Sequence, residues 1–326
     1  MFTGLTGPTA GFGETVVRGA RLAAEDCKSA TLSIEDDQGK PEVAANLVAS
    51  FLGDPDVVAV VGGDTTAASM AASPLAEAKG AAMITPTASA PILTRGKRCT
   101  FRVCATDDLE AQAAARLARE RLHAQRVVII RDTRNDYSVG MAATFAAALP
   151  PAAVFDYAAG DSDFRAQLTS ARALEPDVIF VPGYYGDVAQ IASQARDLGI
   201  RVPLLGGSGW DSPKLIEIGG ASLEGSWFVG WTRPARQSFV QRFRTRYGFE
   251  PDAASAQGYD AVAIACAAVA RGGRDRRLVR DAVAATRDFD GVSGTITIGP
   301  DGNARKPLAA FVIREGKFVD QGTVNP

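Results

Sequence analysis

The segment from Val57 to Thr94 constrains the fold most strongly, because it has the pattern of one strand–helix–strand unit. The apolar run Val57–Val61 ends in glycines and threonines, and a second apolar run, Ala81–Ile84, ends in a loop with Thr87 and Ser89. Short continuous apolar runs are typical of parallel strands covered by helices on both faces. We therefore expect hydroxyl groups and free backbone N–H groups at the carboxyl edge of a parallel sheet, where open α/β sheets bind ligands.

Strand and helix patterns alternate along most of the remaining chain, which predicts an α/β fold. Helices are expected at Glu14–Asp26 and Pro41–Leu52, and further strands at Leu32–Ile34, Phe101–Cys104, Val127–Ile130, Val154–Tyr157, Val178–Val181, Pro203–Leu205 and Trp227–Val229. Near the end of the chain, Thr295–Ile298 and Ala310–Ile313 are expected to pair as a hairpin, with a Pro-Asp-Gly turn in the connection.

An internal echo indicates two similar lobes. Pro55-Asp56-Val57-Val58 opens one strand–loop–helix unit, and Pro176-Asp177-Val178-Ile179 opens another. The next strand follows at the same distance in both units, since Met83 lies 28 residues after Pro55 and Leu204 lies 28 residues after Pro176. A chain of 326 residues is long enough for two domains. Strand starts of this type are common, so a coincidence stays open at this point.

Composition excludes some classes of partner. The 35 basic and 37 acidic residues give a net charge of −2, without the basic surface expected of a nucleic-acid-binding protein or of one bound to anionic lipid. We expect no membrane-spanning run of about 20 apolar residues. The four cysteines have no metal-binding spacing; Cys27 and Cys266 are expected to be small core residues, and Cys99 and Cys104 to lie too far apart for a disulfide.

Catalytic patterns are weak, and we expect neither an enzyme nor a cofactor nor a metal site. The single histidine, His123, follows a charged helix and is expected to be solvated or to cap the helix. Trp210 stands where the nucleophile elbow of hydrolases requires glycine. Asp107-Asp108 open a helix and favour capping or solvation over acid–base chemistry. A hydrolase of unfamiliar type stays open.

Binding patterns are stronger. Thr65 and Thr66 stand at a strand-to-helix junction, where hydroxyl and N–H groups suit a carboxylate, although simple helix capping explains them equally well. Tyr137 and Tyr184 follow two later strands and can supply an apolar wall. The start of the chain reaches turn residues within about four positions, so we expect a trimmed export signal and the start of a first strand upstream; a native cytoplasmic start is the alternative.

In order and spacing, several strings resemble the periplasmic leucine/isoleucine/valine-binding proteins, the branched-chain amino acid type of ABC-transporter solute receptor. They are LTGPTAGFGE at Leu5–Glu14, EDDQGKPEVA at Glu35–Ala44, VVGG and ITPTASAPILT within Val60–Thr94, FRVCATDD at Phe101–Asp108 and GWDSPKL at Gly209–Leu215. The resemblance implies two doubly wound parallel-sheet lobes of the type I periplasmic-binding fold that close over a ligand. Three hinge crossovers are implied near Ala105, Gly230 and Pro307, which gives an N-terminal lobe of residues 1–105 and 231–306 and a C-terminal lobe of 106–230 and 307–326.

The resemblance also implies roles for residues of the first lobe. The loop with Thr66 matches the one that binds the ligand's α-carboxylate, and Thr87 and Ser89 match positions that hold the carboxylate and ammonium. Phe12 matches an aromatic position around the ligand side chain.

In the second lobe, Tyr137 and Tyr184 match the remaining aromatic positions. Ser208 stands where family members that bind amino acids commonly place an acid to pair the ammonium. Asp211 is expected either to replace that acid or to be the N-cap of a helix starting at Pro213.

The resemblance therefore implies an extracytoplasmic, periplasmic solute-binding protein that is monomeric. It would capture a small carboxylate, an amino acid above all, and deliver it to a membrane ABC permease. Two alternatives stay open: a ligand-sensing receptor or regulator of the same fold, and a binder of a non-amino organic acid or amide.

Overall fold

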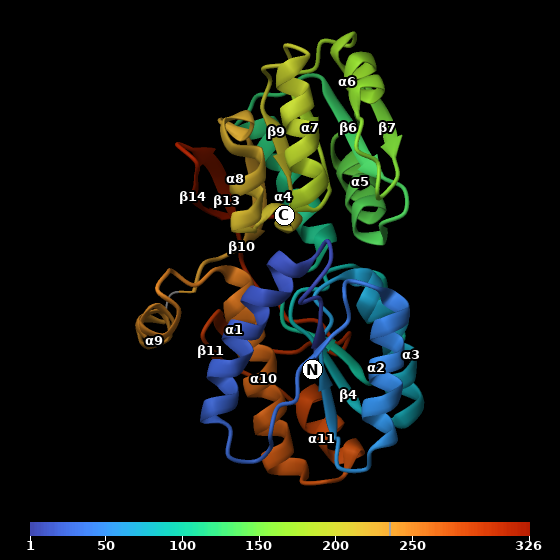
Figure 1. Cartoon of the computed structure of the whole chain (residues 1–326), viewed down its shortest axis with the longest axis vertical. Coiled ribbons are helices and arrows are strands. Elements are labelled where there is room, and N and C mark those ends of the chain that lie inside the picture. The colour runs from blue at the N-terminus through green and yellow to red at the C-terminus, as the bar shows by residue number, and fades with distance from the viewer. Residues whose placement is uncertain (235) are drawn as a thin grey trace. The chain divides into compact units, whose positions relative to one another are not determined.

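The computed structural model describes residues 1–234 and 236–326, which divide into two compact units (Figure 1). Unit 1 comprises Met1–Ala105 and Thr232–Lys306, and unit 2 comprises Thr106–Trp231 and Pro307–Pro326. The chain thus passes from one unit to the other after Ala105, after Trp231 and after Lys306.

Unit 1 is built on short parallel strands. Strands β3 (Ala59–Val61), β4 (Ala82–Thr85) and β5 (Thr100–Arg102) form one parallel sheet, and β1 (Phe2–Thr3) pairs in parallel with β2 (Glu35–Asp36). Its helices are α1 (Ala10–Asp26), α2 (Pro41–Gly53), α3 (Thr66–Lys79), η1 (Pro91–Leu93), α9 (Gln237–Tyr247), α10 (Ala253–Gly272) and α11 (Arg276–Ala284); β11 (Phe289–Gly291) and β12 (Gly294–Ile296) form a small antiparallel pair. The strand–helix–strand unit predicted within Val57–Thr94 is confirmed as β3, α3 and β4.

The strand expected at Leu32–Ile34 lies instead at Glu35–Asp36. Its partner β1 has two residues, and Phe2 and Thr3 are in register with Glu35 and Asp36. Backbone pairing, rather than the apolar pattern of Leu32 and Ile34, therefore sets this strand.

Two glycines allow α1 and α10 to pack closely, side by side in unit 1 (Figure 1). A Cβ on Gly19 would lie 1.7 Å from the carbonyl oxygen of Ser255, and one on Gly258 would lie 2.2 Å from that of Val16. Any side chain at either position would force the helices apart, because such distances are far inside van der Waals contact.

Helix α10 is a core helix despite its composition. Contrary to the expectation from the sequence, its 20 residues are long and apolar enough to span a membrane. However, 72% of its most apolar 18-residue stretch is buried inside the protein, where the helix packs against α1, α11 and strands of unit 1. A helix that is apolar all round is as typical of a protein interior as of a bilayer.

A disulfide joins Cys27, directly after α1, to Cys266 in α10, so the expectation that both are simple core residues is wrong. Their Cα atoms lie 5.9 Å apart, within the range a disulfide needs, although 239 positions separate them in the sequence. The close packing of the two helices brings them together. Cys99 and Cys104 are buried, and neither forms a disulfide within the described residues.

The disulfide predicts a thiol count and a stability effect. Denatured, unreduced protein should expose two thiols, and reduction should expose four. Replacing Cys27 and Cys266 together by alanine should lower the free energy of unfolding by about 2–5 kcal/mol, because the link restricts the unfolded chain. Urea titration of the double variant would measure the loss, and four thiols without reduction would contradict the bond.

Unit 2 contains one seven-stranded sheet in the order β14-β13-β10-β9-β8-β6-β7. Strands β6 (Val127–Asp132), β7 (Ala153–Tyr157), β8 (Val178–Phe180), β9 (Leu204–Gly206) and β10 (Trp227–Trp231) are parallel to their neighbours, whereas β13 (Leu308–Arg314) and β14 (Lys317–Val324) add antiparallel strands beside β10. The helices are α4 (Asp107–Glu120), α5 (Asp136–Ala148), α6 (Arg165–Arg172), α7 (Tyr185–Asp197), η2 (Ser208–Trp210), α8 (Pro213–Gly219) and η3 (Gly220–Leu223).

The hairpin predicted between Thr295–Ile298 and Ala310–Ile313 is wrong. Gly294–Ile296 pairs with Phe289–Gly291 in unit 1, and Leu308–Arg314 pairs with β10 and β14 in unit 2. The crossing after Lys306 separates the two segments, so each finds its strand partner inside its own unit.

Candidate functional site

Of the two threonines at the start of α3, Thr65 caps the helix. Its Oγ1 accepts the backbone N–H of Ala68 at 3.4 Å. Thr66 is the first residue of the helix and is buried. The first turn of α3 contains no acidic side chain, so no carboxylate of its own neutralises the partial positive charge there.

The loop after β4 is tied to the loop after β3 by hydroxyl groups. Thr87 Oγ1 donates to the carbonyl oxygen of Asp64 at 2.8 Å, and Thr85 Oγ1 donates to that of Gly63 at 2.7 Å. Ser89, two residues further, is buried as well. Because the hydroxyl proton of Thr87 is committed to Asp64, the remaining lone pair of Thr87 is suited to accept a hydrogen bond from a ligand.

A buried arginine positions the same loop, and the sequence reasoning missed it. The guanidinium of Arg102, at the end of β5, donates to the carbonyl oxygens of Ala88 at 3.2 Å and Ala90 at 2.6 Å. Its side chain is fully buried. The available signal was a charge directly after Phe101 in an apolar strand.

Asp64 is a buried ionisable residue in the loop between β3 and α3. Its Oδ1 accepts the backbone N–H of Gly4 at 3.3 Å. Burial, then the charge of Asp37, raises the pKa of Asp64 to about 7. Burial also raises the pKa of Asp37 to about 6, opposed by the N–H of Gly39, which donates to it at 2.8 Å.

These raised pKa values predict a loss of stability with rising pH. Between the pKa of an unfolded aspartate, 3.8, and about 7, the folded protein keeps on Asp64 a proton that the unfolded chain has released. The free energy of unfolding should therefore fall as pH rises through this window. Asp64→Asn, whose amide oxygen can still accept from Gly4, should flatten the fall and at pH 8 stabilise the protein by up to roughly 4 kcal/mol.

Urea titrations at several pH values between 5 and 8 would measure this effect. Asp56→Asn is the control, since Asp56 is exposed and should leave the slope unchanged. A slope in Asp64→Asn identical to that of the wild type would show that Asp64 is already ionised across the window.

Phe12, the remaining site residue predicted in unit 1, lies in the first turn of α1 and is 8% exposed. Among the predicted site residues of unit 1, contacts with Asp64 and its loop bring Thr87 beside the start of α3. The role of Phe12 beside a ligand stays a prediction.

The predicted site residues of unit 2 gather around the loop after β9. The rings of Tyr137 and Tyr184 stack with centroids 5.4 Å apart and an interplanar angle of 6°. Tyr137 Oη accepts the backbone N–H of Gly209 at 3.1 Å. Ser208 is the first residue of η2 in the same loop, so three of these residues lie together.

Asp211 is not the N-cap of the helix at Pro213, contrary to one of the two expectations. Ser212 is the cap, and its Oγ accepts the backbone N–H of Lys214 at 3.3 Å. Asp211 is buried, and its own N–H donates to the carbonyl oxygen of Ser208 at 2.9 Å. Its other proposed role, pairing an ammonium, stays a prediction.

Glu110 is the residue of unit 2 that sequence reasoning missed. It lies in the first turn of α4 and is fully buried, and its Oε2 accepts the backbone N–H of Ser208 at 2.9 Å. Burial, opposed by hydrogen bonds from the backbone and the side chain of Ser208, raises the pKa of Glu110 to about 8. In the sequence it is one of three acids at a helix start, a pattern that capping explains.

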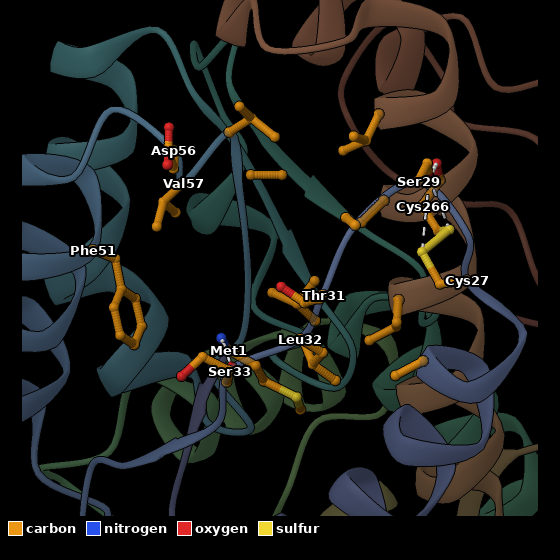
Figure 2. Close-up of a pocket in the computed structure, with 18 of the residues that line it drawn as sticks. Met1, Cys27, Ser29, Thr31, Leu32, Ser33, Phe51, Asp56, Val57 and Cys266 are labelled. Atoms are coloured by element: carbon orange, nitrogen blue, oxygen red, sulfur yellow. Dashed lines mark hydrogen bonds between the residues drawn. A yellow bond between two sulfur atoms is a disulfide. The ribbon is translucent and has the colours of Figure 1, made fainter.

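A separate cavity of about 500 Å³ opens at the amino ends of the unit 1 strands (Figure 2). Leu32, Phe51 and Val57 line it together with the disulfide of Cys27 and Cys266. Its described lining includes none of the eight predicted site residues. Thr66 and Thr87 instead follow the carboxyl ends of β3 and β4.

His123, beyond the end of α4, is exposed.

Comparisons with known proteins fit this geometry. The family model described as periplasmic binding protein matches residues 1–317. The Leu/Ile/Val-binding protein homolog 3 of Brucella melitensis is 28% identical, over 97% of this chain and 90% of its own length. The solved leucine-binding protein LivK of Thermotoga maritima is 34% identical with a TM-score of 0.94, covering 100% of this chain and 97% of that one.

A third relative is the branched-chain amino acid transporter substrate-binding protein LivJ of Streptococcus pneumoniae, solved in complex with isoleucine. It is 27% identical with a TM-score of 0.93, covering 100% of this chain and 98% of that one. These structural relatives have the type I periplasmic-binding fold, and they match nearly the whole chain. The family model likewise covers almost all residues. The chain belongs to the periplasmic binding protein family.

Proposed function

We propose that this chain binds a branched-chain aliphatic amino acid in the periplasm and delivers it to a membrane ABC permease. The names of the relatives support the ligand class: leucine, isoleucine and valine for the Brucella protein, leucine for LivK and isoleucine for LivJ. The observation that carries the proposal is the pair of hydroxyl-bearing loops at the carboxyl ends of β3 and β4.

The α-carboxylate is proposed to bind at the start of α3. The backbone N–H groups of a helix N-terminus and its partial positive charge favour an anion. Thr65 uses its hydroxyl to cap Ala68, which leaves the hydroxyl of Thr66 for the ligand. Thr87, whose proton is donated to Asp64, is proposed to accept from the ammonium.

The aliphatic side chain is proposed to lie against aromatic rings. In unit 2 the stacked rings of Tyr137 and Tyr184 present a rigid apolar surface. Phe12 is the aromatic residue proposed for this role in unit 1. The chemistry that this arrangement supports is reversible capture, because none of these groups is a nucleophile paired with a base.

Ligand-dependent stabilisation would test the function. Leucine, isoleucine or valine, at 100 times its dissociation constant, should raise the free energy of unfolding by about 2.7 kcal/mol. Thermal melts would show the change as a higher midpoint. Isopentylamine, which is leucine without the carboxylate, is the matched control and should give no shift; a panel in which no branched-chain amino acid shifts the midpoint would refute the proposal.

Thr66→Ala tests the carboxylate end. It should weaken leucine binding by about 1–3 kcal/mol, because a hydrogen bond to a charged group is lost. Thr66→Ser keeps the hydroxyl and should retain most of the affinity. Isothermal titration calorimetry would compare the three proteins, and wild-type affinity in Thr66→Ala would remove Thr66 from the site.

A further inference from the structure

Glu110 has a carboxyl group that the protein satisfies only in part. Oε2 accepts the N–H of Ser208, whereas Oε1 is buried and has no hydrogen-bond partner within residues 1–234 and 236–326. No lysine, arginine or histidine in that part of the chain forms an ion pair with Glu110. A buried acceptor without a donor costs free energy, so the site is incomplete without a further donor.

The surroundings of Glu110 are acidic. Asp107 lies on the same turn of α4 and Asp211 in the loop after η2, and both are buried. After burial, the charges of these two aspartates oppose ionisation of Glu110. Tyr137, from α5, is a further titratable group beside it; burial, then the charge of Glu110, raises the pKa of this phenol.

This acidic group lies among residues that the ligand is proposed to touch. Ser208 donates to Glu110 itself, and Gly209, the next residue, donates to Tyr137, which stacks on Tyr184. Ser208 is also the position where the sequence led us to expect an acid. The carboxyl group therefore reaches this loop from α4 instead of from the loop's own sequence.

We propose that Glu110 is the specificity-determining residue that pairs with the ammonium group of the ligand. The inference rests on the proposed function and names the group that selects an amino acid over a carboxylic acid lacking the amine. A primary ammonium has three N–H donors. One of them can donate to Oε1, and the ammonium supplies the positive charge that no side chain of residues 1–234 and 236–326 supplies through an ion pair with Glu110.

Ionisation of Glu110 on binding gives a measurable signature. With a pKa of about 8, Glu110 in the free protein is largely protonated at pH 7. An ammonium partner favours the carboxylate, so binding should release up to about one proton, and affinity should rise with pH below 8 by up to about tenfold per unit. Above pH 8 this rise should stop, because the free protein is then already ionised.

Titration calorimetry with leucine at pH 7, in buffers of different ionisation enthalpy, would count the protons released. Glu110→Gln keeps an oxygen that can accept from Ser208, so the loop should hold its position. This variant should release no proton and bind leucine about 10- to 100-fold more weakly, whereas its affinity for isocaproate, leucine without the amine, should not fall. Glu120→Gln, at the exposed end of the same helix, is the control and should behave as the wild type.

Difference infrared spectroscopy of the wild type gives a second readout that needs no variant. Leucine should remove the band of a protonated carboxyl group, and isocaproate should leave it in place. Glu110→Gln with wild-type leucine affinity and proton release, or an unchanged band in the wild type, would overturn the role of Glu110 alone. A wild type that binds no amino acid would overturn the proposed function as well.

Discussion

Buried carboxyl groups that accept backbone N–H groups from distant loops are the interaction on which the candidate site depends. Three of them join positions far apart in sequence: Asp64 accepts from Gly4, Glu110 from Ser208, and Asp260 from Val292 and Ser293. Each satisfies an N–H group that a strand or helix would otherwise satisfy, at the cost of burying an ionisable group. Asp260 also pairs with a buried cation, Lys306, with 3.7 Å between Nζ and Oδ2. Lys306 is the last residue of unit 1, so this pair holds the start of the third crossing.

The parts of the fold that could be predicted are those in which local pattern and tertiary packing agree. The run Val57–Val61 leads into the parallel strand Ala59–Val61 because it is apolar on both faces, and Thr65 starts α3 because its hydroxyl can cap the helix. The failures share one cause, since each depends on a partner distant in the sequence. The Cys27–Cys266 disulfide exists because Gly19 and Gly258 let two helices approach, and no local pattern reports that.

The same distinction holds within the candidate site. Thr66, Thr87 and Tyr137 could be chosen from the sequence because they follow apolar strands, and the edge of a parallel sheet is defined by such positions. Glu110 could not, because an acid in the first turn of a helix is ordinarily a response to the helix dipole. What distinguishes it is a contact with Ser208, 98 positions later. Its raised pKa follows from its burial in the folded protein, which the hydrogen bond from Ser208 opposes.

In the proposed site, the group that attracts the ligand's carboxylate differs from the group that selects ligands with an amine. A carboxylate bound at the start of α3 would be favourable for an amino acid and for a simple organic acid alike, so that end of the ligand distinguishes little between them. Discrimination requires a group whose state without the correct ligand is unfavourable. A buried oxygen with no donor, beside two further carboxyl groups, is such a group. A ligand without an amine leaves it unsatisfied, whereas an ammonium supplies the missing hydrogen-bond donor and allows Glu110 to ionise. The replacement of an expected acid by Ser208 is then a relocation of the negative charge, because the backbone of Ser208 itself fixes the carboxyl group that takes its place.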